Sequence, residues 1–186
     1  MRIRAGSPGD IEQIATLHAD SWRTAYAGIM PHSYLSRSLS GDKLALWHGR
    51  LTVPDPAAGL FVAVEEGVIA GFVYLTPCPD GRLLLDNLHA RPGRTGTGIG
   101  GRLLRHALAW AVTEHPGRDV YLEVLRANTR AIAFYVRHGA IRTAERVCRF
   151  EQGFALPELE YTWAAQSLMT SGPSFTLTGQ GPDPHA

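Results

Sequence analysis

Apolar and polar residues follow different rhythms along the chain, and each rhythm predicts a different element. Residues 2–5 alternate one by one, as in a short strand, whereas apolar side chains over 11–22 recur every three or four positions, as on one helix face. The residues at 7–10, Ser-Pro-Gly-Asp, have the order of a helix start, with a capping serine and an acid three positions later. We therefore expect a helix that reaches Thr24, and another over 42–50 after several chain breaks.

The middle of the chain is rich in β-forming residues. Runs at 60–65 and 68–75 are joined by Glu66-Gly67, which predicts a hairpin, and a third strand is expected over 82–90. The later pattern predicts, in order, a helix over 99–113, a strand over 120–125, a helix over 128–138, and closing strands over 141–150 and 159–163. The expected class is therefore mixed α/β, with antiparallel hairpins first and one crossover helix afterwards.

A glycine-rich segment connects the third strand to the helix at 99–113. Five glycines fall within residues 93–101, and glycines let backbone N–H groups approach an anion at a positive helix N-terminus. The run 96–101 also matches the dinucleotide fingerprint G-x-G-x-x-G. However, five residues separate it from the strand and antiparallel strands precede it, which argues against that fold. No Lys-Ser/Thr pair follows the glycines, which excludes a Walker loop.

Composition limits the class of protein and of partner. The 186 residues are 45% apolar and 19% charged, which suits one domain with a tail. The 18 basic and 17 acidic residues exclude a generally basic, nucleic-acid-coating protein. Residues 91–149 nevertheless hold eleven arginines against four acids, a surplus of seven positive charges. That surplus surrounds the glycine segment, so we expect a ligand with several phosphate charges and no nucleic acid.

Several other sites are not expected. Two cysteines, Cys78 and Cys148, are too few for a disulfide framework and predict free thiols in a reducing compartment. The N-terminal residues have no signal-peptide pattern, and no apolar run has the roughly 20 residues of a membrane span, so we expect a cytoplasmic protein. Histidines and cysteines lack metal-ligand spacing, so no metal is expected.

Two blocks of residues carry a resemblance to a known family. Leu88-His89-Ala90-x-Pro92, followed by the run 94–100, resembles the acetyl-CoA pyrophosphate loop of the GNAT N-acetyltransferase superfamily. The second block, Leu122-Glu123-Val124 and then Asn128, Ala131, Phe134-Tyr135 and Gly139, resembles that superfamily's second CoA-contacting block. The resemblance covers residues 2–163. Thr95 stands where arginine or glutamine is usual, and Ala140 where phenylalanine is usual.

The resemblance implies a fold and a co-substrate. The fold would be α/β of the α+β type, a mixed and largely antiparallel central sheet that is splayed at the acetyl-CoA cleft and flanked by helices. Residues 1–165 would form the domain. Residues 166–186 carry glycine, proline, serine and threonine and few apolar residues, so we expect a flexible tail there on composition. The implied acetyl-CoA contacts are Leu88, His89, Ala90, Arg94, Thr95, Gly96, Thr97, Gly98, Ile99, Gly100 and Asn128. Residues 88–90 would contribute strand backbone at a bulge that includes His89, and 94–100 the pyrophosphate site.

The resemblance also assigns catalytic and acceptor residues. Tyr135 would protonate the departing thiolate. Glu123 is the first candidate for the general base and Asp86 the second, since the attacking amine must lose a proton. Acceptor contacts are expected from the first helix and the loop after it, at Trp22, Tyr26, Ile29 and Tyr34, and from the closing strands around Arg146 to Phe154.

The sequence thus predicts an N-acetyltransferase that moves an acetyl group from acetyl-CoA to a primary amine, by direct attack on the thioester in a ternary complex. The preferred acceptor is a small molecule, a metabolite or an antibiotic. Two alternatives stay open: acetylation of a protein or peptide at its N-terminus or a lysine, and a non-catalytic CoA-binding regulatory domain. Homodimers are common for this fold, although no residue here indicates one.

Overall fold

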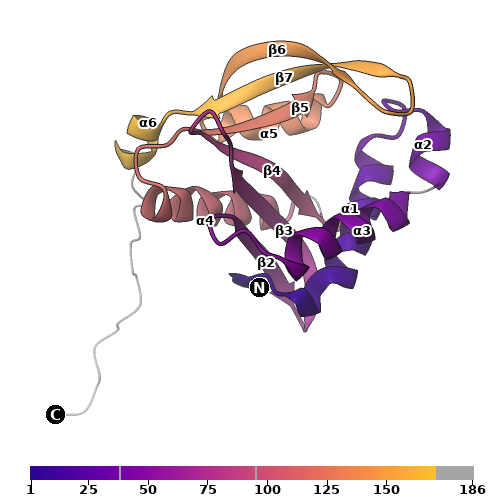
Figure 1. The fold of residues 1–186 in the computed structure, drawn as a ribbon, viewed down its shortest axis with the longest axis horizontal. Coiled ribbons are helices and arrows are strands. Elements are labelled where there is room, and N and C mark those ends of the chain that lie inside the picture. Colours follow the sequence, from indigo (N-terminus) through magenta and orange to yellow (C-terminus); the bar gives the residue numbers. More distant parts are fainter. Residues whose placement is uncertain (38, 95, 171–186) are drawn as a thin grey trace.

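A single seven-stranded sheet organises the computed structural model, which describes residues 1–37, 39–94 and 96–170 (Figure 1). Its strands lie in the order β1-β2-β3-β4-β5-β7-β6. They are β1 (Arg2–Ala5), β2 (Gly59–Glu65), β3 (Val68–Pro77), β4 (Leu83–Ala90), β5 (Val120–Leu125), β6 (Ile141–Arg149) and β7 (Ala155–Trp163). Every neighbouring pair is antiparallel except β4 and β5. The mixed, largely antiparallel sheet predicted from the sequence is therefore confirmed.

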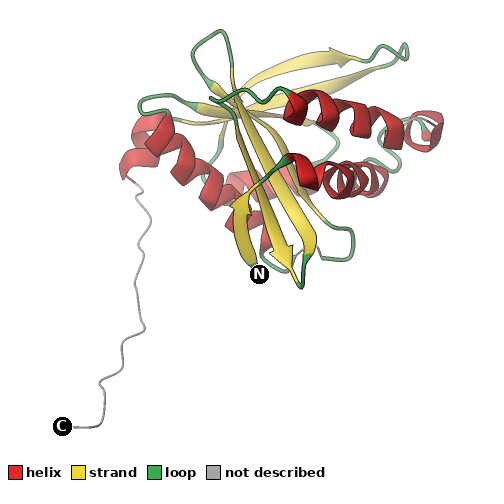
Figure 2. Ribbon diagram, turned by 60° about the horizontal axis from the view of Figure 1, so that its bottom comes forward, coloured by secondary structure: helices red, strands yellow, loops and turns green. Residues whose placement is uncertain are grey.

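Helices lie on both faces of this sheet (Figure 2). They are the short 3-10 turn η1 (Pro8–Asp10), α1 (Ile11–Ala25), α2 (His32–Arg37), α3 (Leu39–Thr52), α4 (Ile99–Glu114), α5 (Thr129–Arg137) and α6 (Ala165–Thr170). One core lies between α4 and the strands β2 to β5 and β7, and a second lies between α1, α3 and the opposite face of β2 and β3. The crossover helix predicted between parallel strands is α4.

The start of α1 is held by a buried carboxylate. Asp10 accepts the backbone N–H of Ser7 at 2.9 Å and both terminal nitrogens of Arg4 at 2.7 Å. The Arg4 guanidinium, with help from Ser7, keeps the pKa of Asp10 below its ordinary value. The capping arrangement predicted at 7–10 is therefore present, and Arg4 additionally joins it to β1.

The sheet opens between β4 and β5. These parallel strands pair only at Leu83 with Val120 and Leu84 with Tyr121. Beyond Leu84 no strand among the described residues pairs with the edge of β4 that faces β5, so its backbone N–H and C=O groups remain available to another extended chain. The predicted splay of the sheet is thus present.

A bulge in β4 changes which side chains face each core. The register with β3 skips Asp86, since Tyr74 pairs with Asn87 and the next β3 residue pairs with Leu85. The extra residue shifts the alternation, so that Leu88 packs against the same core as Leu85. The bulge therefore lies at Asp86, before the segment 88–90 and not within it.

The C-terminal boundary differs from the sequence prediction. A flexible tail was expected from residue 166, but α6 continues the described chain as helix from Ala165 to Thr170, and Leu168 packs against the core beside α4. The remaining part of the predicted tail, 171–186, lies outside the described residues. None of the helices in the described ranges is long and apolar enough to span a membrane.

Gly71 provides a test of how α4 is seated on the sheet. A Cβ at this buried position would lie 2.8 Å from the carbonyl oxygen of His89 and 2.8 Å from Cγ2 of Ile99, in the first turn of α4. We expect Gly71→Ala to destabilise the protein by about 1–3 kcal/mol through overpacking, measured by denaturant unfolding. Gly41→Ala is the control, because a Cβ there meets nothing within 4 Å. Equal stability of the two variants would contradict this packing.

Candidate active site

The loop between β4 and α4 has the backbone geometry of an anion site. Gly93, Gly96 and Gly98 have φ angles of 82°, 88° and 87°, in the left-handed region that favours glycine. Gly98 is also the N-cap of α4, so the N–H groups of the helix's first turn have no acceptor within the helix. A pyrophosphate fits this donor set. Thr95, predicted to contribute, lies outside the described residues.

Ion pairs engage several of the arginines that make residues 91–149 positive. Arg94, predicted to contact the pyrophosphate, forms an ion pair with Glu65 at the end of β2. Arg126 and Arg142 both pair with Glu145, and Arg146 pairs with an acid on β5. The charge surplus is therefore partly neutralised within the fold, and the donors that the loop presents are its backbone N–H groups.

Asn128 and Tyr135 lie on the segment that follows β5. Asn128 caps α5 by accepting the N–H of Ala131 at 3.2 Å, and it lies near the phenol of Tyr26, the residue that ends α1, whose pKa it lowers against the effect of burial. Burial, and then the neighbouring Tyr26 phenol, raise the pKa of Tyr135 above its ordinary value. Burial likewise raises the pKa of Tyr26 to about 12. Tyr135 therefore keeps its proton at neutral pH, as a general acid requires.

Glu123 belongs to a group of two carboxylates that share one arginine. It forms an ion pair with Arg146, whose Nε also donates to Oε2 of Glu158 at 3.0 Å. Burial raises the pKa of Glu158, and the charge of Glu123 raises it further against the opposing effect of Arg146. Glu158 was missed in the sequence because the closing strand was expected to begin at Leu159, whereas β7 begins at Ala155.

Asp86, the second base candidate, occupies the bulge of β4 and already has two donors. Its Oδ2 accepts Nη2 of Arg50 at 2.5 Å and the side-chain amide of Asn87 at 2.6 Å. The pairing with Arg50 holds this carboxylate against α3. Asp86 thus lies at the opening of the sheet, but a proton acceptor there would have to compete with a guanidinium.

The side chain of His89 contributes to packing. Its Nδ1 lies 2.9 Å from the Ser21 hydroxyl, and its ring lies 4.5 Å from that of His18, centroid to centroid. Burial lowers the pKa of His89 to about 3, so the ring is neutral. Because the His89 side chain is engaged in packing, residues 88–90 can contact a co-substrate through their strand backbone.

The four predicted acceptor residues fall in one aromatic cluster. Trp22, Tyr26, Ile29 and Tyr34 pack around a small core with Phe150, Phe154 and Leu156 from the β6–β7 hairpin. Tyr34 contacts Phe150 and Phe154 with centroid distances of 6.1 and 5.6 Å. The hairpin therefore reaches across to α2 (Figure 1).

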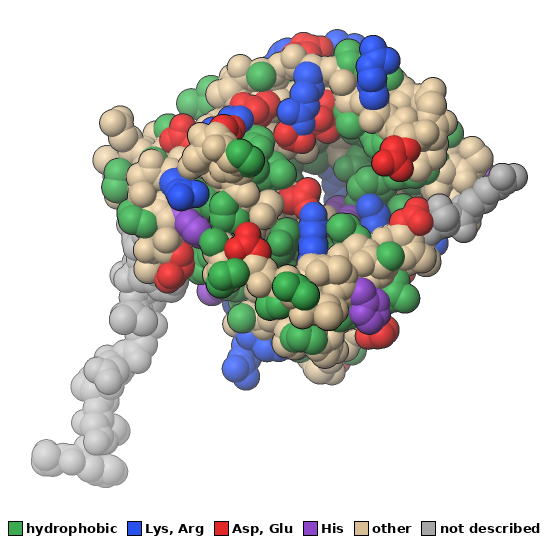
Figure 3. Space-filling view, viewed as in Figure 1, with side chains coloured by type: hydrophobic (Ala, Val, Ile, Leu, Met, Phe, Trp, Pro, Cys, Tyr) green, Lys and Arg blue, Asp and Glu red, His purple; other side chains and the backbone are tan. Residues whose placement is uncertain are grey.

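The surface is hollowed beneath this hairpin, and both acidic and basic side chains border the hollow (Figure 3). A pocket of about 180 Å³ lies beside the end of β5 and the start of β7. Its lining residues are Ile29, Leu125, Arg126, Ala127, Leu156 and Pro157. Among the described residues no group of histidine, cysteine and acidic side chains is arranged to hold a metal ion.

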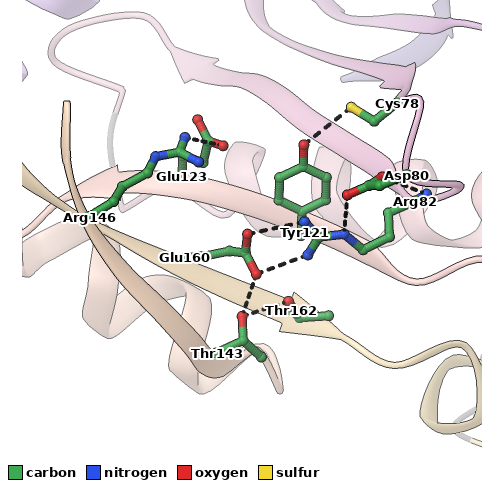
Figure 4. Close-up of polar contacts among 9 residues, drawn as sticks. All are labelled: Cys78, Asp80, Arg82, Tyr121, Glu123, Thr143, Arg146, Glu160 and Thr162. Carbon is green, nitrogen blue, oxygen red and sulfur yellow. Dashed lines mark hydrogen bonds and ion pairs between the residues drawn. The ribbon is translucent and has the colours of Figure 1, made fainter. Parts of the chain in front are cut away.

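A polar cluster closes the joined end of the sheet (Figure 4). Arg82, just before β4, donates to both carboxylate oxygens of Glu160 on β7 at 2.9 and 3.2 Å, and its guanidinium carbon lies 3.8 Å from the ring centroid of Tyr121 on β5. Glu160 also accepts the hydroxyl of Thr143 on β6 at 2.7 Å. The cluster thus ties four strands together where the opening begins.

Comparison with known proteins assigns this chain to a family. The sequence model of the acetyltransferase (GNAT) family matches residues 13–140. The chain belongs to the GNAT acetyltransferases, whose co-substrate is acetyl-CoA. It is 31% identical over 175 residues to Uncharacterized N-acetyltransferase YuaI of Bacillus subtilis, covering 90% of this chain and 95% of that protein. It is 37% identical over 87 residues, 46% of each chain, to Streptothricin acetyltransferase of Streptomyces lavendulae.

A solved structure agrees with the fold. The PaiA N-acetyltransferase from Thermoplasma acidophilum, in complex with coenzyme A, superposes with a TM-score of 0.62 at 21% identity. The match covers 84% of this chain and 96% of that one. The GNAT resemblance, the fold class and the acetyltransferase activity predicted from the sequence are confirmed.

The Arg82 cluster generates a prediction about stability and pH. Arg82 lowers the pKa of Glu160, so the pair stabilises the fold above the ordinary carboxyl value of 4.5 and loses that contribution as falling pH protonates Glu160. Arg82→Met should lower stability by about 1–2 kcal/mol at pH 7, with a smaller loss at pH 3, as measured by denaturant unfolding. Arg142→Met removes a more exposed pair and should cost less. A loss for Arg82→Met that is the same at both pH values would contradict the pairing.

Proposed function

We propose that this GNAT acetyltransferase acetylates the primary amine of a small molecule. The proposal is carried by the unpaired β4 edge together with Asn128 and the protonated Tyr135, both of which lie near Tyr26 in the aromatic cluster of Trp22, Tyr26, Ile29 and Tyr34. The small pocket beside Leu125 and Leu156, about 180 Å³, supports an acceptor of limited size. The partial similarity to a streptothricin acetyltransferase supports a small-molecule acceptor as well.

The reaction joins the amine nitrogen to the acetyl carbon and breaks the bond from that carbon to sulfur. Acetyl-CoA, when bound, supplies the thioester. The backbone N–H groups near Gly98 would hold its pyrophosphate and the free edge at residues 88–90 its extended arm. Tyr135 would give its proton to the departing thiolate, and a carboxylate, acting through water, would take the proton that the amine must lose.

We propose Glu158 as that carboxylate, with Glu123 and Arg146 positioning it. Burial raises the pKa of Glu158, which favours its role as a base near neutral pH, and the charge of Glu123 acts in the same direction. The sequence prediction of Glu123 as the base itself stays open. Asp86 is the less favourable choice because Arg50 and Asn87 already donate to it.

A panel of primary amines, antibiotics and peptides, followed by release of free CoA thiol, tests the proposed function. Steady turnover with small amines is the expected result. Turnover restricted to peptides would instead favour the peptide acetyltransferase, and CoA binding without turnover would favour a regulatory domain. The cytoplasmic location and the homodimer remain predictions.

Tyr135→Phe tests the general acid. Removing only the hydroxyl should lower kcat by about 10²–10³-fold with little change in the KM for acetyl-CoA, since the acid acts on the leaving group. Tyr121→Phe is the control, because the Tyr121 hydroxyl lies 3.2 Å from the sulfur of Cys78 and has no part in the proposed chemistry. A kcat within about threefold of wild type for Tyr135→Phe would exclude this residue as the acid.

Glu158→Gln and Glu123→Gln separate the two carboxylates. If Glu158 is the base, Glu158→Gln loses the acidic limb of the pH profile of kcat/KM. Glu123→Gln keeps that limb but moves it to lower pH, because a like charge that raises the pKa of Glu158 has been removed. The reverse pattern would assign the base to Glu123.

A further inference from the structure

Lys43 is the only lysine in the chain, and the fold buries it beside the proposed acceptor site. It lies on α3 one turn before Trp47, whose side chain is 0% exposed, and is itself 8% exposed. Lysine is almost never this buried unless its charge has a partner. We therefore expect the surroundings of Lys43 to contain a partner for its charge.

The protein supplies Lys43 with one close contact. Its Nζ lies 3.4 Å from the ring centroid of Trp22, a cation–π contact. Within the described ranges no ion pair and no hydrogen bond engages the ammonium. An ammonium has three N–H donors, and the Trp22 ring covers only one side of it. The remaining donors are open to another group.

Two acids, Asp42 and Asp86, and one further cation, Arg50, lie near Lys43. Arg50 and Lys43 are the two cations near Asp86, whose carboxylate is engaged by Arg50 and Asn87. The neighbouring His18 and His89 are neutral, since burial lowers the pKa of both. Burial also lowers the pKa of Lys43, to about 8, which still leaves it mostly protonated at pH 7. Asp86 and Asp42 act in the opposite direction on this pKa, but neither acid forms an ion pair with the ammonium within the described residues.

Aromatic contacts connect this charge to the proposed site of chemistry. The Trp22 ring, which faces Lys43, meets Tyr26 with a centroid distance of 5.0 Å. The Tyr26 phenol lies near both Asn128 and Tyr135. Trp22 and Tyr26 therefore connect the Lys43 ammonium at one end with Tyr135, the proposed acid, at the other.

We infer that the acceptor carries a carboxylate as well as its amine, and that Lys43 on the Trp22 face binds that carboxylate. The inference rests on the proposed function and specifies its substrate class: small zwitterionic amino carboxylates. A carboxylate would complete the hydrogen bonds of the buried ammonium, and Lys43 would orient the opposite, amine-bearing end toward Tyr135.

Matched acceptors test this inference kinetically. ω-Amino acids of three to six carbons are compared with their carboxamides, which keep the amine and lose the charge. We expect wild type to prefer the carboxylates by about 10- to 100-fold in kcat/KM, the range of a charge-assisted hydrogen bond. Lys43→Met should abolish the preference, mainly through KM, while Arg23→Met, which removes an exposed cation of α1, should keep it. Acetylation of both series without preference in wild type would overturn the inference but leave the proposed function standing.

A second measurement does not depend on turnover. Protein labelled with 15Nζ-lysine has one side-chain ammonium resonance, because the chain has one lysine. In the presence of CoA, 6-aminohexanoate should shift this resonance and move its titration midpoint above about 8, since an opposite charge favours the protonated form. The carboxamide should do neither. An unmoved resonance with the whole ω-amino acid series would overturn the inference, whereas absence of turnover with every amine would overturn the proposed function alone.

Discussion

The parting of β4 from β5 after two residue pairs is the constraint on which the rest of the structure depends. Backbone groups on the free β4 edge need hydrogen-bond partners, and an extended ligand arm can provide them. The Arg82 cluster keeps the strands joined at one end, and the first turn of α4, packed over Gly71, begins near the other. The two GNAT blocks pack together beside this opening, since a Cβ at Gly100 would lie 3.6 Å from the ring of Phe134.

Ion pairing governs what the acids around the opening can do. Glu123 and Glu158 share Arg146, and Asp86 pairs with Arg50, so each candidate base has a guanidinium partner. Burial and a like charge set Glu158 apart by raising its pKa. Lys43 differs from these groups because its positive charge rests on a tryptophan face without a carboxylate partner among the described residues. The proposed carboxylate binding at Lys43 and the proposed proton donation by Tyr135 therefore lie at opposite ends of the Trp22–Tyr26 contact.

Local sequence pattern predicted most of the elements because their signals are short-range. The Glu66-Gly67 turn has φ angles of 51° and 78°, as the hairpin at this position requires, and Asn128 caps α5 where the second GNAT block begins. Glu158 was missed for a different reason. It follows Gly153 and Pro157, which are typical of turns, and is in a strand because β5 and β6 pair with β7 on either side. The bulge at Asp86 has no local signal either, since it depends on the register with β3.

The sequence by itself determined the order of the elements, the glycine loop and the family, because these depend on spacing between near neighbours in the chain. Only the tertiary structure decided which charges meet. Arg94 pairs with Glu65, Glu123 shares Arg146 with Glu158, and Lys43 lies beneath Trp22. Those partners are far apart in sequence or on different elements, and their burial and distances, which decide pKa and binding, exist only once the sheet and helices have packed.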